Sequence, residues 1–220
     1  MEVNNLSEIV LQRIDLVLLD LDNTLYEYNS CHEKALAAVI DKASIHFRIE
    51  RGHILELYMK YREMVYQRHR VTAASHSRLF YLQAMIEELC NTTDIEWVNL
   101  LYNLYWDVFI DEMTLFDDAI FFLHKCLAEK IPIVLVTDMI AEVQFKKVMK
   151  LKIGKYLKFI VTSEEAGVEK PHPFIFELAI SKLDSQNKNI KKIVVIGDDK
   201  WKDVYSSPLY EVDLYHRVEN

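Results

Sequence analysis

Two aspartates, Asp20 and Asp22, follow directly after the apolar run at residues 14–19. A short continuous apolar run is typical of a strand buried in a parallel sheet, and side chains spaced two apart on a strand project to the same side. Ligands of open α/β sheets bind beyond the carboxyl ends of the strands, where two carboxylates repel each other unless a divalent cation or a shared proton compensates. A turn that caps a helix needs only one such residue, so two aspartates at this spacing favour a catalytic or metal-binding role over a capping role.

Three further apolar runs, at residues 131–136, 159–161 and 193–196, also lead into polar residues. These polar residues are Thr137 and Asp138, then Lys170, and finally Asp198, Asp199 and Asp203. Helical patterns separate the runs, which predicts parallel strands whose carboxyl ends line one edge of a sheet. We therefore expect that edge to gather the acids and Thr137, with Lys170 reaching in from its loop.

The composition is that of a globular protein of 220 residues, with 51% apolar and 27% charged residues and a net charge of −8. It predicts one domain or one core with an inserted subdomain. No run is long enough to span a bilayer, the start lacks signal-peptide features, and the three cysteines form no CxxC pair. We expect a cytoplasmic protein, a monomer or homodimer, that binds neither nucleic acid nor membrane.

Positive charge gathers in residues 48–78, which hold seven Lys or Arg against three acids, a net of +4. A solvated helix face accounts for most of these charges. We assign a different role, contact with an anionic substrate, to Arg78 alone.

Helical periodicity fills residues 27–113, where an ordinary crossover between parallel strands needs only a short connection. Helices are predicted at residues 30–47, around 54–65, at 76–89 and at 95–109, with Ser30 and Glu33 as a capping box at the first of them. An ordinary crossover helix is predicted at 117–129. This pattern predicts a helical subdomain at 27–113 inserted into a core formed by residues 1–26 and 114–220.

The motifs resemble those of the haloacid dehalogenase-like superfamily, in its phosphatase branch with a helical cap after the first strand. Asp20 to Leu25 matches the DxDxT signature, Thr137 the second motif, Lys170 with Pro171 the third, and Gly197-Asp198 with Asp203 the GDxxxxD motif. The stretch Asp20 to Tyr26 also resembles the pyrimidine nucleotidase-like subgroup. The resemblance implies an α/β fold, a three-layer Rossmann-like parallel sheet core with an inserted all-helical cap subdomain.

The resemblance also implies a phosphomonoester hydrolase that uses Mg²⁺. Asp20 would be the nucleophile that forms an aspartyl-phosphate, and Asp22 the general acid and base. Asp22 would need a raised pKa, which a crowded acidic edge favours. Asp20 and Asp198 would ligate the Mg²⁺ through their side chains and Asp22 through its backbone carbonyl. Lys170 would neutralise the nucleophile and the phosphate together.

The remaining candidates have supporting or substrate-binding roles. Thr137 would donate to a phosphoryl oxygen, and Asp203 would orient Lys170 or a metal-bound water. Asp138 and Arg78 complete the candidate substrate-binding set, although a second negative charge at Asp138 is unfavourable near phosphate unless it points away or is paired. Asp199 is either a metal ligand or a capping residue.

Other activities of the superfamily compete with this interpretation. A dehalogenase or a phosphonate hydrolase of the superfamily leaves Asp22 unexplained. A phosphosugar mutase keeps both aspartates and stays open, as does a non-catalytic binding module. The substrate is expected to be a small phosphorylated metabolite such as a nucleotide or sugar phosphate.

Overall fold

The structure, a computed structural model, describes residues 1–184 and 189–218. The chain divides into two compact units, each with its own core. The core unit consists of Met1–Glu27 and Thr114–Asn220, and the helical unit of Tyr28–Met113. No described helix combines the length and the apolar character needed to cross a bilayer.

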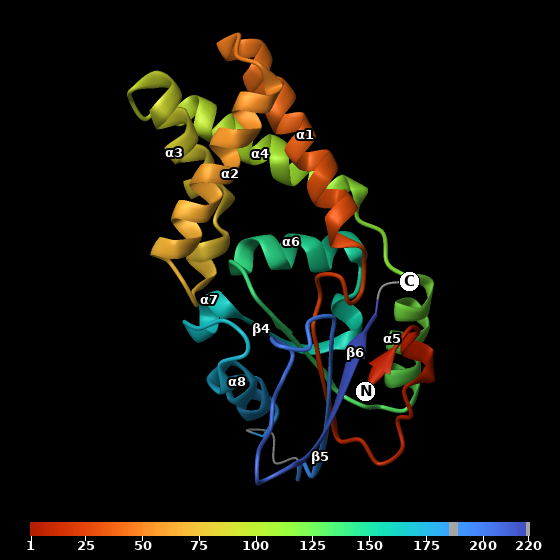
Figure 1. Ribbon diagram of the computed structural model, residues 1–220. Helices are drawn as coiled ribbons and strands as arrows, with labels where there is room; N and C mark the ends of the chain where they lie inside the picture. Colours follow the sequence, from red (N-terminus) through yellow and green to blue (C-terminus); the bar gives the residue numbers. More distant parts are fainter. Residues whose placement is uncertain (185–188, 219–220) are drawn as a thin grey trace. The chain divides into compact units, whose positions relative to one another are not determined.

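Parallel strands form one sheet in the core unit (Figure 1). The described strands are β1 (Glu2–Val3), β2 (Leu16–Leu19), β3 (Ile133–Thr137), β4 (Leu157–Thr162), β5 (Lys192–Gly197) and β6 (Glu211–Arg217), in the spatial order β1-β6-β5-β2-β3-β4. Every residue of β2 and β3 is buried, as expected for strands covered on both faces. The predicted α/β class with a Rossmann-like parallel sheet is confirmed.

The strand order places a topological switch point between β2 and β5. The chain passes from β2 to its neighbour β3 and on to β4, and then returns to the other side of β2 with β5. Loops leaving the carboxyl ends of β2 and β5 therefore diverge, which opens a crevice of the kind in which α/β proteins bind ligands. Asp20 follows β2 and Asp198 follows β5, so both lie at this point.

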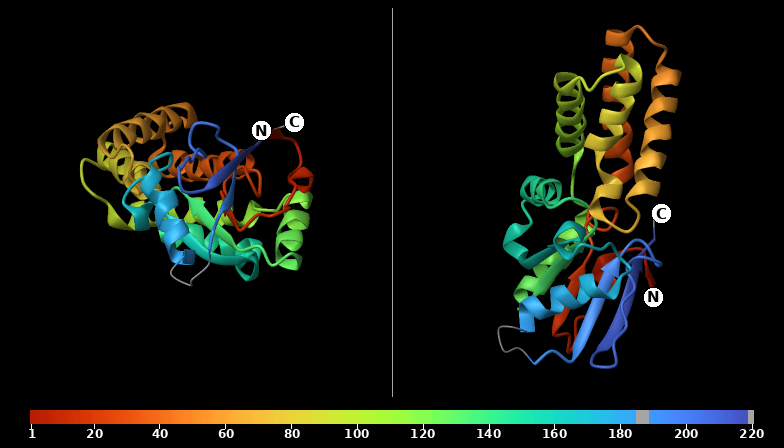
Figure 2. Two further views of the ribbon diagram at one scale, coloured as in Figure 1. Left: turned by 90° about the horizontal axis from the view of Figure 1, so that it is seen from below. Right: turned by 90° about the vertical axis from the view of Figure 1, so that its left-hand side faces the viewer.

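Helices of the core unit cover the two faces of the sheet. They are α5 (Asp117–Ala128), α6 (Ala141–Leu151), the short α7 (Ser163–Ala166) and α8 (Pro173–Asp184). Right-handed crossovers require α5 and α6 on one face and α8 on the other, because the chain reverses its direction across the sheet after β4. Figure 2 shows α8 and α5 on opposite sides of the strands. Phe176 and Ile180 of α8 pack on Leu16, Leu18 and Val134 in one buried cluster.

The helical unit contains α1 (Tyr28–Phe47), α2 (Arg51–Arg68), α3 (Arg78–Cys90) and α4 (Ile95–Glu112). The predicted capping box is wrong, because α1 begins at Tyr28 and Ser30 lies inside it. The predicted helix at 76–89 also begins too early. A 3-10 turn, η2 (Ala73–His76), precedes it, and Ser77 caps α3 by accepting a hydrogen bond from the backbone N–H of Phe80.

Candidate active site

Asp20 lies buried at the end of β2 and is held by two side chains. Lys170 Nζ donates to Asp20 Oδ1 over 2.6 Å, and Thr24 Oγ1 donates to Asp20 Oδ2 over 2.9 Å. Lys170 also donates to Asp203 Oδ1 over 2.6 Å. All three charged groups are almost completely buried, so one ammonium group is shared between two carboxylates in a region of low dielectric.

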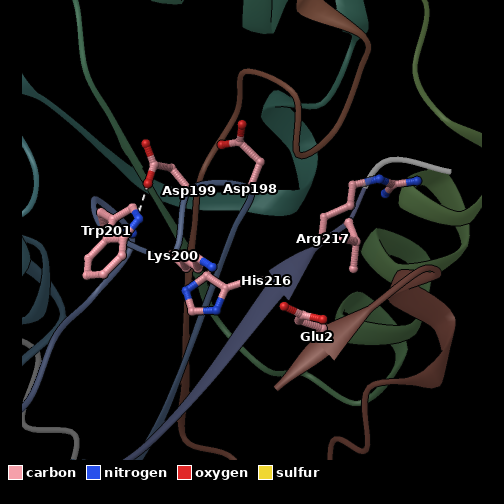
Figure 3. Close-up of a pocket in the computed structure, with 8 residues that line it drawn as sticks. Glu2, Asp198, Asp199, Lys200, Trp201, His216 and Arg217 are labelled. Carbon is pink, nitrogen blue, oxygen red and sulfur yellow. Dashed lines mark hydrogen bonds between the residues drawn. The ribbon is translucent and has the colours of Figure 1, made fainter.

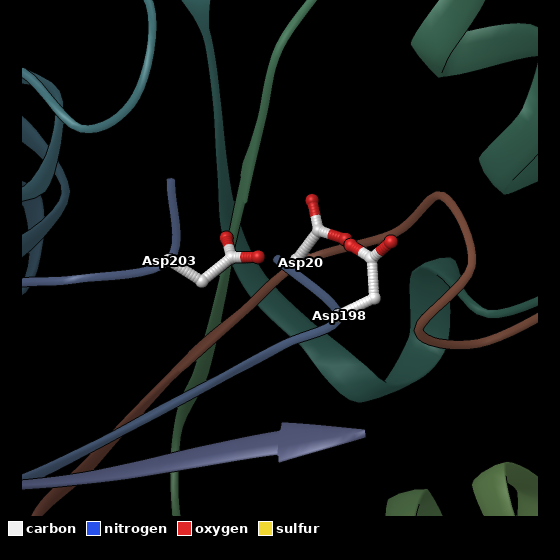
Figure 4. A group of neighbouring side chains, drawn as sticks. All are labelled: Asp20, Asp198 and Asp203. Carbon is white, nitrogen blue, oxygen red and sulfur yellow. The ribbon is translucent and has the colours of Figure 1, made fainter. Parts of the chain in front are cut away.

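Asp198 joins this group from the end of β5 (Figure 4). One carboxylate oxygen from each of Asp20, Asp198 and Asp203 lies within 4.8 Å of the others. The turn that brings Asp203 back beside β5 requires glycine at position 197, because a β-carbon there would lie 2.0 Å from the Asp203 carboxyl group. The Gly197-Asp198 sequence therefore has a steric reason as well as a chemical one.

The charges of this cluster balance only with a further cation or a bound proton. Three carboxylates face one ammonium group, and both oxygens of Asp203 are occupied, one by Lys170 and one by the backbone N–H of Asp199 at 3.1 Å. Burial and the nearby carboxylates raise the pKa of Asp20 well above its ordinary value although Lys170 opposes them. Such an oxygen-rich, over-charged cluster fits a hard divalent cation held by Asp20 and Asp198.

We expect the metal-free protein to lose thermal stability through Asp198 as the pH rises. Burial, followed by the neighbouring charge of Asp203, raises the pKa of Asp198 to about 6. A carboxyl group whose pKa is higher in the folded than in the unfolded protein stabilises the fold while it is protonated, and this contribution is lost as the pH rises through the folded pKa. The Tm of Asp198→Asn should therefore gain on that of the wild type between about pH 4 and pH 7.

Thermal unfolding in chelator measures this difference, and Asp199→Asn is the matched control because an amide oxygen can still accept in that turn. Added MgCl₂ at neutral pH should raise the Tm of the wild type more than that of Asp198→Asn. A Tm difference between Asp198→Asn and the wild type that is the same at every pH would contradict the assignment.

Asp22 lies in a second group of contacts, with its own cation. Lys147 Nζ lies 2.7 Å and 2.8 Å from the two carboxylate oxygens, the Tyr26 hydroxyl donates to Oδ1, and Gln144 Nε2 lies 3.4 Å from Oδ2. Burial alone would raise the pKa of Asp22, but Lys147, Tyr26 and Gln144 outweigh it and lower the pKa below its ordinary value. The expected raised pKa is therefore wrong, because the expectation lacked Lys147.

Sequence reasoning missed Lys147 and Gln144, which come from α6. The buried face of α6 contains Val143, Val148 and Leu151, and both polar residues lie on it. The Lys147 side chain is completely buried. The pattern that indicates them is a lysine and a glutamine on the apolar side of an amphipathic helix, since such residues are buried only with polar or charged partners.

Thr137 is the last residue of β3 and Asp138 follows it, next to these groups. Gln144 Nε2 donates to the Thr137 hydroxyl oxygen and also to the backbone carbonyl of Asp138, the latter over 2.8 Å. The Asp138 carboxylate accepts from the backbone N–H of Lys170 at 2.9 Å and from Lys202 Nζ at 3.1 Å. Its negative charge is therefore paired and used to position the loop that carries Lys170.

Asp199 is engaged in a turn. Its Oδ1 accepts from the backbone N–H groups of Trp201 at 2.8 Å and Lys202 at 3.3 Å, which is the geometry of a capping residue. Arg78 is the one candidate that belongs to the helical unit, where it is buried.

A pocket of about 410 Å³ opens beside Asp198 at the β5–β6 side of the sheet (Figure 3). Its lining includes Lys200, His216 and the exposed Trp201. Arg217, also in the lining, pairs with Asp118 at 2.8 Å and donates to the Thr24 carbonyl at 3.2 Å, so it ties β6 to the turn that carries Thr24. The pocket gives Asp198 access to solvent.

The sequence matches the haloacid dehalogenase-like hydrolase family over residues 14–206. The chain belongs to this family. It is 31% identical over 189 residues to a ribulose-1,5-bisphosphate 5-phosphatase of Halopiger xanaduensis, a match that covers 86% of this chain and 78% of the relative. It is 22% identical to a glyceraldehyde 3-phosphate phosphatase of Pyrococcus furiosus, over 90% of this chain and 78% of the relative.

The solved structures agree in fold. A phosphatase of the family from Thermococcus onnurineus superposes with a TM-score of 0.68 at 18% identity, covering 93% of this chain and 94% of the other. A 2-haloacid dehalogenase from Pseudomonas syringae gives a TM-score of 0.65 at 21% identity, over 86% and 80%. The family match together with the phosphatase relatives makes this chain an enzyme of the family's phosphatase branch, as the motifs predicted.

Proposed function

We propose that this enzyme is a Mg²⁺-dependent phosphomonoesterase that hydrolyses a phosphorylated sugar through an aspartyl-phosphate on Asp20. The observation that carries the proposal is the buried Asp20 carboxylate, held by Lys170 and Thr24 beside Asp198. A carboxylate oriented in this way and facing a surplus of acid suits a nucleophile that works with a bound cation.

Asp20 attacks phosphorus in the first step, and the sugar oxygen leaves. Lys170 offsets the negative charges of the nucleophile and of the incoming phosphate, which would otherwise repel each other. The hydroxyl of Thr137 lies at the end of the neighbouring strand and is proposed to donate to a phosphoryl oxygen. A bound Mg²⁺, held by Asp20, Asp198 and the backbone carbonyl of Asp22, would supply further stabilisation of the charge that develops on the phosphoryl group.

Asp22 acts on the protons of both steps. In the first step its carboxyl group protonates the leaving oxygen, and in the second the carboxylate accepts a proton from the water that cleaves the aspartyl-phosphate. The contact with Lys147 keeps Asp22 ionised in the resting protein. The ionised Asp22 carboxylate is ready to act as the base of the second step. For the first step, Asp22 must take up a proton although Lys147 favours its ionised form.

The relatives indicate the substrate class. One acts on ribulose 1,5-bisphosphate and another on glyceraldehyde 3-phosphate, both small phosphorylated sugars. Because the identity to the first is higher, ribulose 1,5-bisphosphate is the first substrate to test.

A substrate panel tests the proposed function. We expect rapid release of inorganic phosphate from one or a few sugar phosphates, slower release from nucleotides, and loss of activity in chelator that added Mg²⁺ restores. Measuring phosphate release against sugar isomerisation separates a hydrolase from a mutase, since a mutase returns the phosphate to the sugar. A metal-replete protein that releases no phosphate from any ester of the panel would refute the proposal.

A further inference from the structure

Arg78 is a buried cation in the helical unit, at the first position of α3. Only 6% of its surface is exposed. Its guanidinium is always charged at physiological pH, and a buried charge is strongly unfavourable unless an opposite charge accompanies it.

The partners of Arg78 are all neutral. Nη1 donates to the backbone carbonyl of His76 at 2.8 Å, and Nη2 donates to the hydroxyl of Tyr28. The rings of Tyr105 and Trp106 each lie 5.5 Å from the guanidinium carbon, close enough for cation–π attraction. The ionisable groups that act on Arg78 most are tyrosines, and no carboxylate in the described part of the chain is paired with it.

Polar atoms around Arg78 are also left without partners. Arg78 Nε and the hydroxyl of Tyr58 form no hydrogen bond with any described residue, although the Tyr58 side chain is almost fully buried. Each is a donor, and an unused buried donor is costly. The positive charge and the spare donors therefore point to one missing kind of group, an acceptor with negative charge.

The nearby residues His32 and Arg62 add no negative charge to the group around Arg78. Burial, followed by the charges of Arg78 and Arg62, lowers the pKa of His32 to about 4, so His32 is neutral at physiological pH. His32 Nδ1 lies 2.7 Å from the hydroxyl of Tyr105 and helps to fix it. Arg62 is exposed to solvent and lies near Tyr58, so a second cation stands close to the group.

We infer that the helical unit carries an anion-binding site at Arg78, with Tyr58 as a further donor, that takes a phosphate group. An arginine fork with a hydroxyl beside it matches the tetrahedral arrangement of phosphate oxygens. The anion that we expect there is free inorganic phosphate.

Binding of inorganic phosphate tests this inference. Sodium phosphate should raise the Tm of the wild type more than that of Arg78→Met, which is similar in length but uncharged. Arg51→Met is the matched control, since Arg51 belongs to the same unit but is exposed and paired with Asp41. In phosphate-free buffer Arg78→Met should be as stable as the wild type or more so, because the uncompensated buried charge is gone.

Other outcomes separate this inference from the proposed function. Equal stabilisation of the wild type, Arg78→Met and Arg51→Met by phosphate overturns the inference. A wild type that hydrolyses no phosphate ester overturns the proposed function instead, while the Tm measurement still decides whether the site binds phosphate. Should Arg78→Met fail to fold, Arg78→Lys retains the charge but not the fork, and should show a smaller rise in Tm with phosphate than the wild type.

Discussion

Replacing Asp20 by asparagine should lower the turnover of every phosphate ester by about 10⁴-fold or more, a loss typical of removing a nucleophile. The amide has nearly the shape of the carboxylate but cannot form the phospho-enzyme. Its oxygen still accepts a hydrogen bond from Lys170, its NH2 group can donate to the hydroxyl of Thr24, and it removes one charge from a cluster with too many acids. The Tm of Asp20→Asn should therefore equal or exceed that of the wild type. Phosphate release and thermal unfolding measure the two effects.

Asp15 supplies the matched control at the other end of the same strand. Its carboxylate accepts from the backbone N–H groups of Lys191 and Lys192, both at 2.9 Å, far from the acidic cluster along β2. Asp15→Asn should keep near wild-type turnover. Mass spectrometry of acid-quenched wild type should find phosphate on Asp20 during turnover. Substantial turnover by Asp20→Asn would remove the nucleophile from the proposed mechanism.

Lys147→Met should lower kcat by about 10- to 100-fold, at the lower end of the effect of losing a general acid or base. The lysine holds both oxygens of Asp22, and without it the carboxylate loses its position and its counter-ion. Because Lys147 lowers the pKa of Asp22, its removal raises that pKa. The acid limb of the pH profile of kcat, which follows ionisation of the base, should therefore move to higher pH.

The adjacent Lys146 is the control for this variant. It lies on the outer side of α6, 49% exposed and 2.7 Å from Glu142, so Lys146→Met should leave the pH profile unchanged. Lys147→Arg retains the charge and should restore part of the lost kcat. A Lys147→Met enzyme with a lower kcat but an unshifted acid limb would make Lys147 a packing residue only.

The sheet and the gathering of acids could be predicted from the sequence because both follow from local patterns. A buried parallel strand leaves a continuous apolar run, and the runs of β2 and β5 lead into Asp20 and Asp198, which lie at the switch point. The sequence alone therefore predicts that Asp20, Asp198 and Lys170 meet. The strand β6 was not predicted, since only partly buried residues fill Glu211–Arg217 and they form no apolar run.

The contacts of Asp22 and Arg78 could not be predicted from such local sequence patterns. Helical periodicity shows that position 147 faces inward, but not which strand end the lysine reaches. The pKa of Asp22 was predicted in the wrong direction for this reason. Arg78 was singled out only as a charge in a basic stretch, and its burial among tyrosines depends on the packing of α1, α2, α3 and α4, which the sequence pattern leaves open.

The short pairing at the base of the insertion has a consequence for how this enzyme family diversifies. Tyr26 pairs with Leu115 in an antiparallel bridge, and Phe116 N–H donates to the Leu25 carbonyl at 3.0 Å. The outgoing and returning chains are thus fastened together within the core unit, so the intervening sequence closes a loop whose two ends are already adjacent. Such an attachment tolerates exchange of what it carries at little entropic expense. The whole segment between Glu27 and Thr114 can therefore be exchanged, by evolution or by design, while the hydrolytic residues of the core unit are kept.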